Sequence, residues 1–312
     1  MKRRGRGRGA RAVAALVLLV LAAGVAVVLS NPRHRAFYLG LLTRATPGPG
    51  EGAAGALTRP RFRLPTPHGF GEAPSAPAIA PTAAVGPGRR VPLPDADGRI
   101  RVPVADRLPF RLPAEGVPAG WELREFTGRA SAELVRAETG VALRLRSVQT
   151  SFALYRDVIV DLREQPFLSW SWKVVRLPAG GDVRQRATDD EAAQVYVIFP
   201  RWPSPLTTSD AIGYVWDTRA PVGAQLVSPT AGNVRIIVLQ SGRAGLDAWQ
   251  DEQRNVAADY LALFGRAPPR VGQVALMIDT NDTRGEAEAL FGDLVFSRTP
   301  GGRTESPTSM LR

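Results

Sequence analysis

The chain has 312 residues, no cysteine, two histidines and a formal net charge of +11. The lack of cysteine excludes disulfides, thiolate metal sites and a cysteine nucleophile. Because both histidines, His34 and His68, lie in the first third, the remainder has no imidazole base, no His-ligated zinc and no Ser-His-Asp triad.

The positive charge is concentrated in the first third of the chain. Residues 1–94 contain 14 Lys and Arg against two acids, whereas residues 95–312 contain 26 against 27. The later part is therefore nearly neutral and lacks the basic surface that a phosphate backbone requires. We expect no nucleic-acid partner.

Residues 1–11 and 12–30 predict a basic cytoplasmic flank and a transmembrane anchor. Six of the first 11 residues are Lys or Arg, and residues 12–29 contain no charged or strongly polar side chain. At ~1.5 Å per residue, this run nearly spans a hydrocarbon core of ~30 Å. A cleaved signal peptide, with an apolar region of roughly 7–15 residues, is the alternative. The positive-inside rule predicts a single-pass inner-membrane protein with its domain in the periplasm.

Residues 31–98 are interpreted as a spacer, because 16 of the 27 prolines fall between Pro32 and Pro118. Such a segment is semi-extended and forms neither helix nor sheet. Residues 299–312, which are rich in Gly, Pro, Ser and Thr, predict a disordered tail. Residues 99–298 between them are expected to form one domain.

Short runs rich in Val, Ile, Tyr, Phe and Trp predict the strands of this domain. They lie at 121–126, 133–137, 141–147, 152–162, 167–177, 192–199, 211–216, 234–239, 271–278 and 290–297. This spacing is typical of a mostly-β sandwich of the jelly-roll kind. Residues 246–264 place Trp249, Gln253, Val256, Tyr260 and Leu263 at helical spacing, which predicts one amphipathic α-helix.

Two tryptophans alternate within the predicted strand 167–177. Period two places Trp170 and Trp172 on one face with Leu168 and Val174, and Lys173 on the other. Two indoles on one face suit the stacking of sugar rings, but their aliphatic neighbours favour core packing. Lys173 is the only lysine after residue 94, and a pairing role is favoured over a catalytic one.

The acidic run 189–191 precedes the predicted strand 192–199 and contains Asp189, Asp190 and Glu191. Three interpretations of this run are open: the side chains are solvated or form structural hydrogen bonds, they bind calcium, or one of them acts as an acid or base. Together with Asp279, the two aspartates are the calcium candidates of the sequence, and no other cofactor is expected.

A second polar run, residues 279–283, follows the predicted strand 271–278. It begins like an EF-hand loop, but Arg284 stands at the sixth place instead of Gly and Leu290 at the twelfth instead of Glu. It is therefore not an EF-hand, and a turn capped by Asx side chains is favoured. On the predicted helix, Glu252, Asn255 and Asp259 form a polar stripe beside Arg254, which either faces solvent or closes over the sheet.

Six strings of the domain together resemble domain-of-unknown-function family 3047 (DUF3047) over about residues 105–298: SWSWKV, TDDEAAQVYVIF, YVW, DEQRNVAADYLALFG, VALMIDTNDT and FGDLVF. The resemblance implies an exported or envelope protein with a jelly-roll domain similar to galactose-binding-like and carbohydrate-binding modules. It implies no established activity.

The residues that carry the resemblance are Trp170, Trp172, Lys173, Asp189, Asp190, Tyr196, Trp216, Glu252, Arg254, Asn255, Asp259, Tyr260, Asp279 and Thr283. Two positions depart from the family: Gln194 stands where an Arg is common, and Asn281-Asp282 stands in the reverse order. If these positions contact a ligand, we expect either its identity or its affinity to depart from the family pattern here.

Three functional hypotheses follow. The leading one is a non-catalytic binding domain for an envelope glycan, with binding candidates Trp172, Lys173, Asp189, Asp190, Trp216, Glu252, Arg254, Asn255, Asp259, Asp279, Asn281 and Asp282. The second is a structural or protein-interaction domain of the cell envelope. The third is a polysaccharide hydrolase, which requires two carboxylates about 5–10 Å apart, such as Asp189 and Asp279.

Overall fold

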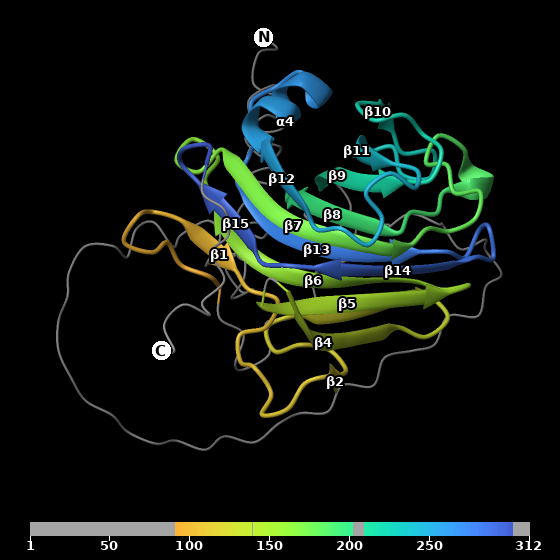
Figure 1. Cartoon of the computed structure of the whole chain (residues 1–312). Helices are drawn as coiled ribbons and strands as arrows, with labels where there is room; N and C mark the ends of the chain where they lie inside the picture. Colours follow the sequence, from red (N-terminus) through yellow and green to blue (C-terminus); the bar gives the residue numbers. More distant parts are fainter. Residues whose placement is uncertain (1–90, 139, 202–208, 302–312) are drawn as a thin grey trace, which may run out of the picture. The chain divides into compact units, whose positions relative to one another are not determined.

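The structure, a computed structural model, describes residues 91–138, 140–201 and 209–301. They form a mostly-β, jelly-roll-like sandwich of two sheets with one α-helix in the described part (Figure 1). The predicted membrane anchor, most of the spacer and nearly all of the predicted tail lie outside the described residues. Within the described ranges, no helix has the length and apolarity needed to span a membrane.

Sheet A is built around β7 (Phe167–Arg176). Its order is β1 (Ile100–Val102), β15 (Leu294–Ser297), β7, β14 (Glu286–Phe291), β5 (Gly140–Val148), β4 (Ser131–Ala137) and β2 (Ala114–Glu115). Strands β14 and β15 follow one another along one edge of β7, and β12 (Gln250–Asn255) pairs with its other edge. The predicted strand 290–297 is therefore divided, at Gly292 and Asp293, between two strands.

Sheet B has the order β10 (Gln225–Val227), β11 (Val234–Ser241), β9 (Asp210–Asp217), β8 (Ala193–Phe199), β13 (Val271–Asp279), β6 (Ser151–Val160) and β3 (Glu122–Thr127). All neighbours are antiparallel except β9 and β11, which run parallel. A 3-10 turn, η1 (Arg186–Thr188), lies in the connection from β7 to β8. Nine of the ten predicted strands are confirmed, and the tenth, 290–297, is the one divided between β14 and β15. The short strands β1, β2 and β10 carried too little pattern to be predicted.

The core lies between the sheets and is rich in aromatic side chains. Trp170 and Trp172 project from β7 and are 1% and 0% exposed. Their rings pack on Tyr214 and Trp216 of β9 with centroid distances of 5.4 and 6.2 Å. Core packing of the tryptophan pair, the favoured interpretation of its alternation, is confirmed.

The predicted helix over residues 246–264 is wrong in its first half. Residues Gln250–Asn255 form β12, and α4 covers only Val256–Phe264 (Figure 1). A separation of four residues places side chains on one face of a helix and equally on one face of a strand, so Trp249 and Gln253 fitted both patterns. Pairing with β7 decides the outcome. The Asn255 side chain then starts the helix by accepting a hydrogen bond from the Ala258 N–H.

The strand β1 joins the sandwich at one edge of sheet A. It pairs only with β15, through three residue pairs. Arg101 of β1 forms an ion pair with Asp293 at 2.6 Å, and the other oxygen of Asp293 accepts a hydrogen bond from the Val104 N–H. Asp293 thus fixes both β1 and the start of the loop that follows it.

Candidate functional site

The structure places the predicted binding residues in three separate parts of the domain. Asp189, Asp190, Asp279, Asn281 and Asp282 come together at one end of sheet B. Six others lie near β12 and α4: Trp172, Trp216, Glu252, Arg254 and Asp259 lie toward the space between the two sheets, and Asn255 caps the start of α4. Lys173 lies on the outer face of sheet A. No single pocket collects them.

The first group belongs to an acidic end cluster, which we define as Asp189, Asp190, Glu191, Asp217 and Asp279. It lies where β8 begins and where β9 and β13 end, because these antiparallel neighbours bring opposite ends of the chain segments together. All five side chains are buried. Within the described residues, no ion pair joins any of them to an Arg or Lys.

Two aspartates of the cluster hold neighbouring loops through backbone amides. Asp190 accepts hydrogen bonds from the N–H groups of Asp282 and Thr283, at 3.1 and 2.6 Å, and from the Thr283 hydroxyl. Asp217 accepts from the N–H groups of Val183 and Ala220. The carboxylates of Asp190 and Asp217 therefore stabilise the loops at this end of sheet B by accepting hydrogen bonds from their backbone amides.

The other three carboxyls have few compensating contacts. Burial, followed by the neighbouring negative charges, raises the pKa of Asp189 to about 7. Burial also raises the pKa values of Glu191 and Asp279 well above their usual range. The Oε1 atom of Glu191 is buried without a hydrogen-bond partner. At neutral pH, proton uptake reduces the charge of this end of the domain.

No three His, Cys, Asp or Glu side chains in the described ranges are placed to share a metal ion. The calcium role of Asp189, Asp190 and Asp279 therefore stays a prediction from the sequence. The turn after β13 is held by Asx contacts, since the Asp279 side chain accepts a hydrogen bond from the Asn281 N–H.

The second group is an edge network that links the two sheets. Glu252 of β12 accepts hydrogen bonds from Trp172 Nε1 at 3.2 Å and from Gln240 Nε2 of β11 at 2.8 Å. Arg254 binds Asp259 of α4 through two hydrogen bonds, at 3.0 and 2.6 Å. Burial raises the pKa of Glu252. The network satisfies polar groups inside the sandwich, and together with the complete burial of Trp172 and Trp216 it favours structural roles for this group.

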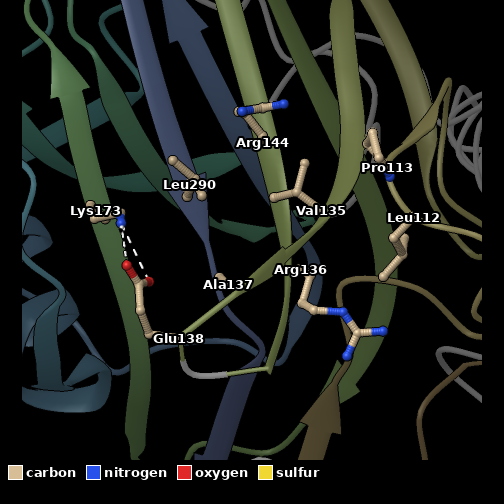
Figure 2. A pocket seen from close by; sticks show the side chains of 9 residues that line it. All are labelled: Leu112, Pro113, Val135, Arg136, Ala137, Glu138, Arg144, Lys173 and Leu290. Atoms are coloured by element: carbon tan, nitrogen blue, oxygen red, sulfur yellow. Dashed lines mark hydrogen bonds and ion pairs between the residues drawn. The ribbon is translucent and has the colours of Figure 1, made fainter.

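The third place is a hollow on the outer face of sheet A, with a volume of about 490 Å³. We call it the sheet-A hollow and define it by its lining residues Leu112, Pro113, Val135, Arg136, Ala137, Glu138, Arg144, Lys173 and Leu290. Figure 2 shows Lys173 and Glu138 on one side of it and Leu112 and Pro113 on the other, with Leu290 and Val135 between them.

Strand alternation explains why these side chains meet. Leu290 of β14 is the registered partner of Lys173 of β7 and of Arg144 of β5. Each of these strands turns its other residues toward the tryptophan core, so the outer positions form a row across the sheet. The Leu246-to-Asn255 segment continues the row, because β12 pairs with β7.

Trp249 lies at the β12 end of this row and is partly exposed. Its Nε1 donates a hydrogen bond of 2.8 Å to Glu138, and Lys173 donates another of 3.2 Å. The Lys173 ammonium lies 5.7 Å from the centre of the indole ring. The hydrogen bond from Trp249, with further contributions from a backbone hydrogen bond and from Lys173, lowers the pKa of Glu138 to about 2. An ionised acceptor, a cation and an indole thus stand side by side.

Only Lys173 of this group was a predicted site residue. Trp249 was assigned to the helix, and Glu138 is an ordinary turn residue in the sequence. The signal that could have found Trp249 is the alternation of Trp249, Asp251 and Gln253, which the register with β7 places on one face.

No curated protein sequence matches the chain. Among solved structures, it is similar to a family 11 carbohydrate-binding module from Clostridium thermocellum, with 10% identity, 65% of this chain and 97% of that chain covered, and a TM-score of 0.34. It is also similar to the endoglucanase Cel12A from Rhodothermus marinus, with 13% identity, 59% and 99% covered, and a TM-score of 0.34. The xyloglucanase domain of NopAA from Sinorhizobium fredii gives 11% identity, 59% and 96% covered, and a TM-score of 0.34.

Likenesses at these identities and TM-scores carry no functional argument. The family comparison is decisive, because one family model matches residues 119–295, more than half of the chain. The chain therefore belongs to the family described as protein of unknown function (DUF3047).

Proposed function

We propose that the domain is a non-catalytic binding module that takes a carbohydrate across the outer face of sheet A. The observation that carries the proposal is a row of side chains across this face, at a hollow of about 490 Å³. In order, the row consists of Trp249 just before β12, Lys173 on β7, Leu290 on β14 and Arg144 on β5. Neighbouring strands lie roughly 4.8 Å apart, so the row has the length of a few sugar rings.

The chemistry of the row suits a saccharide. A partly exposed indole offers a flat apolar face on which a sugar ring can stack. The ionised Glu138 accepts hydrogen bonds from hydroxyl groups, while Lys173 donates them. A mostly apolar depression with a few polar groups of fixed direction is the usual form of a small-molecule site.

The same groups argue against hydrolysis. A glycosidase needs a carboxylic acid of raised pKa together with a second carboxylate. Glu138 is the only acid among the described residues that line the hollow, and its pKa is lowered to about 2. The carboxyls of raised pKa, such as Asp189 and Asp279, are buried in the acidic end cluster, where a polysaccharide has no access.

In this proposal the predicted N-terminal helix tethers the domain to the inner membrane, so the ligand is a glycan of the envelope. The neutral charge of residues 95–312 suits an uncharged or weakly charged polymer better than nucleic acid.

The test is a glycan array followed by calorimetry on the full chain. Trp249→Ala should weaken binding of the selected saccharide at least roughly tenfold, as expected for an aromatic anchor, and Glu138→Gln should weaken it as well. Leu261→Ala is the matched control, because Leu261 is an exposed apolar residue on α4. Binding of no saccharide, or equal binding by the wild type and Trp249→Ala, would overturn the proposal.

A further inference from the structure

We infer that the loop between β1 and β2 inserts its tip into the surface of an anionic phospholipid bilayer. This interaction is distinct from the proposed saccharide site. Its starting observation is the exposure of two large apolar side chains: Leu108 is 58% exposed and Phe110 is 98% exposed. Among the described residues, no other large hydrophobic side chain is as exposed as Phe110.

The base of this loop is firmly held. Val104 and Ala105 are buried in the core. The Asp106 N–H donates a 2.8 Å hydrogen bond to the Ala119 carbonyl, and the Asp106 carboxylate forms an ion pair with the buried Arg156. The projection of Leu108 and Phe110 is therefore a feature of the fold, since the residues directly before them are fixed.

The charges around the tip are positive. Arg107 and Arg111 flank the two apolar residues and are exposed. Within the described part of the chain, neither forms an ion pair, and the same holds for Arg136, which lines the hollow with Leu112 (Figure 2). Asp106 is already neutralised by Arg156. The tip thus presents two apolar side chains between two free guanidinium groups.

This pattern fits a bilayer better than a protein. A specific protein interface buries at least about 1,000 Å² in total, far more than two side chains at a loop tip supply. A bilayer surface accepts a small apolar tip among its acyl chains, while arginines beside that tip contact lipid phosphates. Anionic headgroups add attraction for the basic residues. The chemistry therefore identifies an anionic lipid surface as the partner.

The experiment uses the absence of cysteine in the chain. Leu108→Cys in the full chain is labelled with an environment-sensitive fluorophore and mixed with vesicles of phosphatidylcholine alone or with phosphatidylglycerol. Acyl chains carrying a nitroxide quencher report insertion. The control label is placed at Val222→Cys, an exposed apolar position between β9 and β10.

We expect a blue shift and quenching of the Leu108 label with phosphatidylglycerol vesicles, and several-fold less quenching with phosphatidylcholine. The Val222 label should change with neither. Phe110→Ser and the double change Arg107→Gln with Arg111→Gln should each reduce quenching several-fold. Phe110 and the two arginines are exposed, so these changes should leave the melting temperature unaltered.

Unchanged emission of the Leu108 label with both vesicle types would overturn the inference. A blue shift that depends on protein concentration but not on lipid would also overturn it, because it indicates a second copy of the chain as the partner. The saccharide proposal is separable from this one: Trp249→Ala should leave lipid quenching intact, and Phe110→Ser should leave saccharide affinity intact.

Discussion

The acidic end cluster should make the domain less stable as the pH rises from about 4 to 8. Burial raises the pKa of Asp189 from 3.8 to about 7 and raises those of Glu191, Asp217 and Asp279. A carboxyl whose pKa is higher in the folded state binds its proton more tightly there. Its stabilising contribution is complete below the unfolded pKa and disappears as the pH rises through the folded pKa.

The size of the effect follows from Asp189. A rise of its pKa from 3.8 to about 7 corresponds to roughly 4 kcal/mol of unfolding free energy lost over that pH range. Asp189 is 3% exposed, so solvent screens this term little. Glu191, Asp217 and Asp279 add in the same direction. Glu138 and Asp161, whose pKa values are lowered to about 2, are ionised in the folded state over this whole range. They add a slope of opposite sign only at its acid end, near the pKa values of the unfolded chain, and none above about pH 6.

The measurement is urea denaturation between pH 4.5 and 8.5, followed by the fluorescence of the buried tryptophans. Asp189→Asn should flatten the pH dependence and stabilise the domain at pH 8, because an amide carries no charge and its oxygen can still accept the hydrogen bond from the Thr230 hydroxyl. Asp251→Asn, an exposed change on β12, is the control. The reasoning is refuted if wild-type stability is flat or rises with pH, or if Asp189→Asn keeps the full slope.

Two further changes test sheet B, the first in the middle of β9 and the second in the acidic end cluster. Gly213→Ala should lower the free energy of unfolding by roughly 1–3 kcal/mol, because a Cβ atom there would lie 2.7 Å from Tyr196 Cε1. Gly232→Ala is the control: its Cβ would meet no atom within 4 Å, so stability should change by less than about 0.5 kcal/mol. Equal melting temperatures for the two variants would contradict the prediction. Asp190→Ala should cost roughly 2–4 kcal/mol, because it leaves the Asp282 and Thr283 donors without their acceptor, and hydrogen exchange should show faster exchange of these amides; unchanged protection would exclude the role.

The strands were predictable because alternation is a local property. In residues 167–177 the alternation of apolar and polar side chains predicts the two faces of the strand. The structure places Trp170 and Trp172 in the core and Lys173 on the outer face, as expected. The helix was overextended because a four-residue spacing is common to helix and strand. Only the distant pairing of Glu252 with Trp170 across β12 and β7 distinguishes them.

The candidate site was less predictable, for a different reason. The sequence shows residue types that carry chemistry, such as Asp189 and Glu252, but it does not show whether their side chains are buried. In the structure, both carboxyls accept hydrogen bonds from other side chains of the domain. The sheet-A hollow joins residues from five separate segments, so Glu138 and Trp249 become neighbours only through the register of β4, β5, β14, β7 and β12. Such a surface has no signature along the chain.

The attachment of β1 has a mechanical consequence. This strand enters the sandwich at an edge of sheet A, with only three residue pairs to β15 and a partly exposed Arg101–Asp293 ion pair. A load pulling on the residues before Ile100 would act first on these contacts at the edge of sheet A. Ile100 and Val102 of β1 are buried in the same core as the tryptophans, so separation of β1 would expose that core, and a domain held at its N-terminal side would begin to open under tension at this edge.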